Sequence, residues 1–222
     1  MWNKPRRLPS VNTDAFTLVE ILIAMAIVGF VIGAIYSVFV STNRSYHTQD
    51  RVADAQQRVR VGIDFMVSDI RMAGFDSVGP ASDAVESDGA GIKEATDTKI
   101  RFTSDMNMSG AIEVSSAVPN PERITYFYDP NDNKLKRITD EGVVGSESTQ
   151  TLVKDVIANV SGQPLFIYRD ADDNIMATPV AVTDLDDIRT VEIEMTVQGV
   201  DVRGVAFTRV LRTRVSCRNL GT

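Results

Sequence analysis

The chain has little of the chemistry on which most enzymes and metal sites depend. Its 222 residues include one cysteine, Cys217, and one histidine, His47. A single cysteine excludes an internal disulfide, and a single histidine excludes a histidine-based catalytic triad or metal cluster. No P-loop and no dinucleotide-binding glycine pattern is present. We therefore expect a non-enzymatic protein without a cofactor, in which Cys217 is a small apolar side chain and His47 is solvated.

Positive charge is also scarce. The formal net charge is −7, although the first 15 residues are basic, with Lys4, Arg6 and Arg7 against Asp14. The remainder of the chain is thus more acidic still. Because affinity for nucleic acid comes largely from neutralising phosphates, nucleic acid is an unlikely partner for such a chain.

Charge is absent altogether from one long apolar stretch. No Asp, Glu, Lys or Arg occurs between Ile21 and Val40, a run long enough to cross the roughly 30 Å hydrocarbon layer of a bilayer as a helix. Lys4, Arg6 and Arg7 before it predict a cytoplasmic N-terminus. We expect a single-pass membrane protein whose remaining residues lie on the side of the membrane opposite to the N-terminus.

Glu20, at the edge of this apolar stretch, decides between three interpretations. A secretory signal peptide has a shorter apolar core and a small-residue cleavage site after it, which this sequence lacks. A plain membrane anchor fits the length but leaves Glu20 without a role, other than a carboxylate that reaches the interface. Since a carboxylate in or beside hydrocarbon is costly, we expect Glu20 to have a partner.

A third interpretation follows from Ala15-Phe16-Thr17-Leu18-Val19-Glu20. This segment resembles the prepilin processing motif of type IV pilins and type II secretion pseudopilins. The resemblance implies cleavage between Ala15 and Phe16 by a prepilin peptidase, N-methylation of Phe16, and pairing of Glu20 with the new cationic amine of its own or a neighbouring subunit. The family usually has glycine before the cut; alanine is also small, so we expect processing.

The apolar stretch continues into an amphipathic helix. From Ser41 to Met72 there is no proline and a single glycine, Gly62, so one helix from Phe16 to about Met72 is predicted, about 85 Å long. Its apolar stripe consists of Val52, Ala55, Val59, Ile63, Met66, Ile70 and Ala73, widened by Val61, Phe65 and Met72. Gly74 is the predicted C-terminal cap of the helix.

The end of this helix indicates which group of pilin-like proteins the chain resembles most. The run Asp69-Ile70-Arg71-Met72-Ala73-Gly74-Phe75 resembles the helix end of PilW-type minor pilins. Pseudopilins of the J class are similar but usually lack the Ala-Gly-aromatic ending. The C-terminal Arg218-Asn219-Leu220 resembles the ending of both groups.

Strand-like runs fill the rest of the chain. After a loop at 76–98 they occupy 99–104, 123–129, 134–139, 165–169, 188–198 and 205–217. The predicted fold is α+β, a long helix packed on an antiparallel β-sheet, as in pilins. The expected segments are a leader at 1–15, a transmembrane or filament-core half-helix at 16–40, an amphipathic half-helix at 41–74 and a periplasmic domain at 75–222.

Two polar features of the domain have alternative explanations. Asp170, Asp172 and Asn174 match the start of a calcium loop, but Ile175 stands where that loop needs glycine, so turn formation explains them more simply. A similar partial match lies at 129–133. The basic run Arg209, Arg212, Arg214 and Arg218 fits either a patch for an acidic partner or a solvated strand face.

The leading hypothesis is a minor pilin of the type IV pilus that helps prime filament assembly at the tip. Its expected partners are prepilin peptidase, other minor and major pilins through the N-terminal helix, the inner-membrane assembly platform and the lipid bilayer. A type II secretion pseudopilin is the alternative within the class. A membrane-tethered periplasmic enzyme or ligand-binding domain is the alternative of another class, and a tip adhesin would use the loops at 76–98 and 141–150.

Overall fold

The computed structural model describes residues 16–77, 89–112, 121–145, 147–157, 164–200 and 204–220. Its chain divides into two compact units, with the boundary between His47 and Thr48. One helix, α1 (Leu18–Met72), covers 55 residues and belongs to both units. It is the only α-helix among the described residues. Its apolar portion is long enough to cross a membrane by length and composition, with a mean hydropathy of 2.7 over the best window.

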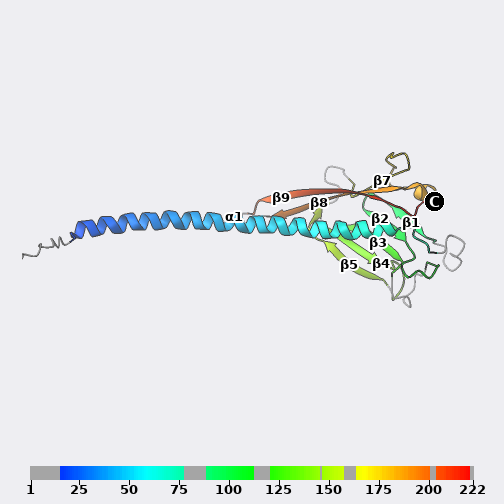
Figure 1. The fold of residues 1–222 in the computed structure, drawn as a ribbon, viewed down its shortest axis with the longest axis horizontal. Coiled ribbons are helices and arrows are strands. Elements are labelled where there is room, and N and C mark those ends of the chain that lie inside the picture. The colour runs from blue at the N-terminus through cyan, green and yellow to red at the C-terminus, as the bar shows by residue number, and fades with distance from the viewer. Residues whose placement is uncertain are drawn as a thin grey trace, which may run out of the picture. The chain divides into compact units, whose positions relative to one another are not determined.

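The first sheet of the second unit is a meander in chain order (Figure 1). Each neighbouring pair of strands is antiparallel. Its strands are β1 (Gly91–Ala95), β2 (Lys99–Thr103), β3 (Arg123–Asp129), β4 (Lys134–Thr139) and β5 (Ser148–Val153).

The second sheet is organised around its central strand, β8 (Thr190–Val200), which pairs with β9 (Ala206–Ser216) along its whole length. The short strands β6 (Val156–Ile157) and β7 (Phe166–Arg169) pair with separate stretches of β8. Because β9 occupies one edge of β8 completely, β6 and β7 share the other edge. A 3-10 helix, η2 (Val182–Asp187), lies between β7 and β8 in the chain.

The second half of α1 contributes one face to the core. Among its buried side chains, Val59, Ile63, Met66 and Ile70 join a single cluster with residues of both sheets, including Phe102, Tyr126, Phe166 and Ile193. Their spacing of three and four residues puts them on one side of the helix. Burial of this stripe holds the second half of α1 against the strands (Figure 1).

These observations confirm the α+β class, the long helix and its main apolar stripe. The expected strand runs are confirmed within two residues at each end. The widened stripe was wrong at two positions, because Val61 and Phe65 are 48% and 53% exposed. Val67, on the other flank, packs against the core instead.

The strands that were not expected are β1, β5 and β6, and there are two sheets instead of one. β1 lies in the segment predicted as a loop, and β5 (Ser148–Val153) begins inside another. Both are poor in the alternating apolar pattern: four of the six residues of β5 are exposed, and β1 contains a register shift. β1 and β5 are strands because their backbones pair with β2 and β4, and such pairing requires no alternating apolar pattern in the sequence.

Candidate processing and assembly region

The start of α1 is closed by a reciprocal pair of hydrogen bonds between Thr17 and Glu20. The Glu20 N–H donates to the Thr17 hydroxyl oxygen at 3.3 Å, and the Thr17 N–H donates to Glu20 Oε2 at 2.9 Å. The Thr17 hydroxyl also donates to the same carboxylate oxygen at 2.9 Å. This is a capping box, which satisfies N–H groups that a helix start leaves without partners.

The capping box fixes where the helix begins relative to the expected cut. Phe16 and Thr17 are not helical, and the Phe16 side chain is 81% exposed. Ala15 and the leader cations Lys4, Arg6 and Arg7 lie outside the described residues. Sequence reasoning assigned Glu20 to charge pairing and missed the role of Thr17, although threonine followed three residues later by glutamate is a recognised sequence signal for this cap.

The apolar half of α1 is a single helix with an exposed apolar surface. Its large side chains from Leu18 to Phe39 are exposed all round the helix. Gly29 and Gly33 have no atom within 4 Å of the place where a Cβ would stand. Contacts within the described part of α1 therefore do not explain these two glycines.

The end of α1 is attached to the first sheet through Asp69. Its Oδ2 accepts hydrogen bonds from the Tyr126 hydroxyl at 2.6 Å and from Arg137 Nε at 2.8 Å. Tyr126 and Arg137 are directly opposed on β3 and β4. Burial, followed by the charge of Asp69, raises the pKa of Tyr126, so its hydroxyl remains a donor.

The C-terminal residues contact the same helix end. Gly74, two residues beyond α1, has φ of 76°, and a Cβ there would lie 2.5 Å from Leu220 Cδ2. The side-chain amide of Asn219 donates to the Arg71 carbonyl at 3.3 Å. The structure thus brings together the helix-end run, which resembles PilW-type minor pilins, and the C-terminal run, which resembles both minor pilins and pseudopilins.

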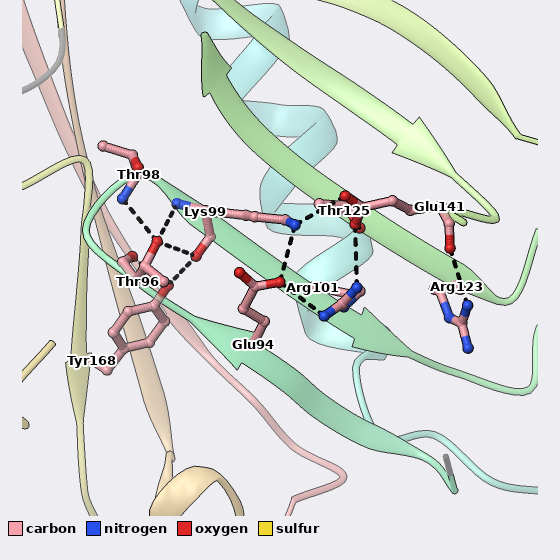
Figure 2. Close-up of polar contacts among 9 residues, drawn as sticks. All are labelled: Glu94, Thr96, Thr98, Lys99, Arg101, Arg123, Thr125, Glu141 and Tyr168. Carbon is pink, nitrogen blue, oxygen red and sulfur yellow. Dashed lines mark hydrogen bonds and ion pairs between the residues drawn. The ribbon is translucent and has the colours of Figure 1, made fainter. Parts of the chain in front are cut away.

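A polar network covers the face of the first sheet opposite to α1. Figure 2 shows Lys99 and Arg101 of β2 between two carboxylates, Glu94 and Glu141. Lys99 Nζ lies 3.0 Å from Glu94 and 2.9 Å from Glu141, and the Thr125 hydroxyl donates to Glu141 at 2.7 Å. Burial acts to raise the pKa of Glu141, but the hydrogen bonds from Lys99 and Thr125 outweigh it and lower the pKa.

The same view contains a link between the two sheets. The hydroxyl of Tyr168 on β7 lies 3.0 Å from the Thr96 carbonyl and 3.1 Å from the Lys99 carbonyl, both at the β1–β2 connection (Figure 2). Burial raises the pKa of Tyr168 well above its ordinary value. No sequence signal distinguishes this tyrosine from others in strands.

The calcium candidates are occupied by turn hydrogen bonds. Asp170 Oδ1 accepts the N–H groups of Asp172 and Asn174, each at 2.9 Å, and Asp170 Oδ2 accepts the Asn174 side-chain amide at 3.0 Å. In the similar turn at 129–133, Asp129 accepts from Asn131 and forms an ion pair with Lys136. Within the described residues, no group of three or more His, Cys, Asp and Glu side chains is placed to hold a metal ion.

The other residues named in the sequence analysis differ in their surroundings. Arg212 and Arg214 form ion pairs with Glu194 and Glu192 of β8, at 2.8 Å and 3.2 Å. His47 is exposed. Cys217 is buried, and this burial raises the pKa of its thiol to about 12, so the group stays protonated and unreactive at neutral pH.

Residues 12–36 match a protein family described as the prokaryotic N-terminal methylation motif. The match supports a type IV pilin-like or pseudopilin-like protein. It implies processing by a prepilin peptidase and assembly with pilins, and together with the apolar helix it indicates membrane anchoring. Comparisons with curated proteins and with solved structures found no match.

Proposed function

We propose that this chain is a minor pilin of the type IV pilus, similar to the PilW group, and a structural subunit without enzymatic activity. It is held in the inner membrane with a cytoplasmic N-terminus and a periplasmic domain, and after cleavage it enters the filament through residues 16–40. There it helps prime assembly at the tip with other minor pilins. The observation that carries the proposal is the methylation motif at the start of a long helix whose apolar half is exposed all round.

The geometry of Glu20 supports a role in assembly beside its role in the cap. Both hydrogen bonds from Thr17 go to Oε2, and among the described residues Oε1 has no partner. Cleavage before Phe16 would create a cationic amine within one helical turn of that oxygen. Oε1 can accept a hydrogen bond from this amine, or from that of a neighbouring subunit, while Oε2 keeps the cap.

A type II secretion pseudopilin is the second candidate within the class, because the methylation motif is common to both. Co-purification distinguishes them: recovery with minor pilins supports the proposal, and recovery only with secretion components contradicts it.

Mass spectrometry of the chain expressed with its prepilin peptidase tests the processing step. We expect a mature protein that begins with N-methylated Phe16, and an unprocessed protein when the peptidase is omitted. A chain that keeps Met1 in the presence of an active peptidase would contradict the proposal. It would favour a membrane-tethered periplasmic domain.

Two substitutions of Glu20 separate charge pairing from helix capping. Glutamine can keep the capping box but carries no charge, whereas alanine removes both. We expect Glu20→Gln and Glu20→Ala to be processed normally and to lower incorporation into filaments about tenfold or more, as measured by immunoblotting of sheared filaments against membranes.

A control variant, Asp50→Asn, removes one carboxylate from an exposed position farther along α1 and should leave incorporation unchanged. Normal incorporation of Glu20→Gln with a defect only in Glu20→Ala would assign Glu20 to the cap alone and would contradict charge pairing.

A further inference from the structure

We draw no further inference here: the strongest candidate, the acidic surface of the β7–β8 connection, where Asp172, Asp184 and Asp187 line a hollow of about 390 Å³, is a cluster of carboxylates for which nothing in the described structure shows what binds to it or covers it.

Discussion

Gly62 of α1 lies against Val153, the last residue of β5. A Cβ at this position would stand 2.4 Å from Val153 Cγ2, and the β-branched side chain of Val153 has little freedom to move away. Any larger residue at 62 would separate the helix from the sheet. The only glycine between Ser41 and Met72 is therefore required by packing, although a glycine in a helix interior is unfavourable by itself.

Replacement of Gly62 by alanine should thus lower the free energy of unfolding. Overpacking costs about 1–3 kcal/mol, which exceeds the gain of about 0.8–1 kcal/mol that alanine brings to a helix interior. Urea unfolding followed by circular dichroism measures the difference. In a Val153→Ala background the same change should be neutral or stabilising, because the clashing methyl group is gone. Equal destabilisation in both backgrounds would contradict the packing explanation.

At the scale of elements, the outer face of the first sheet depends on Glu141, which follows β4 and gathers Lys99, Arg101 and Thr125 from β2 and β3. Glu141→Gln should lower the free energy of unfolding at neutral pH by about 1–2 kcal/mol. The carboxylate pKa is lowered in the fold, so its stabilisation is present above the unfolded-state pKa and is lost as the pH falls through the folded-state value.

The difference between the wild type and Glu141→Gln should accordingly shrink below about pH 4.3. Urea unfolding at a series of pH values measures it. Glu147→Gln, a change of the same kind at an exposed residue, is the control. A difference that stays constant down to pH 3 would show that Glu141 acts through shape instead of charge.

The strands themselves show what sequence patterns can and cannot predict. In β8 apolar and polar residues alternate from Val191 to Gln198, with Val191, Ile193 and Met195 buried, so its existence and its inward face were predictable. β5 presents mostly exposed polar residues and owes its place to pairing with β4. The Thr17–Glu20 cap was readable from sequence, whereas the contact of Asn219 with the Arg71 carbonyl joins residues 148 positions apart and was not.

At the scale of the whole molecule, the second unit is one core between two sheets, without a disulfide to connect them. Tyr168 is a polar link between the sheets. Tyr168→Phe should lower the free energy of unfolding by about 1–2 kcal/mol, because the hydroxyl is lost and the Thr96 and Lys99 carbonyls lose their partner.

The pH dependence of the free energy of unfolding gives a second test of the role of Tyr168. Because the folded-state pKa of Tyr168 is raised, its contribution is present below the unfolded-state pKa and is lost as the pH rises above about 10. The variant should lack this part of the alkaline loss. Tyr128→Phe, whose hydroxyl bonds to Asn133 within one hairpin, is the control. Equal alkaline profiles for wild type and Tyr168→Phe would refute the assignment.

The capping box at the start of α1 also has a consequence for the timing of maturation. Thr17 and Glu20 both lie on the C-terminal side of the expected cut, so the mature chain inherits the first helical turn of its precursor. If the chain is processed as proposed, its precursor and mature forms share this first turn and differ in charge. Under the proposed function, cleavage therefore changes the charge at the start of α1 and leaves its capping hydrogen bonds in place.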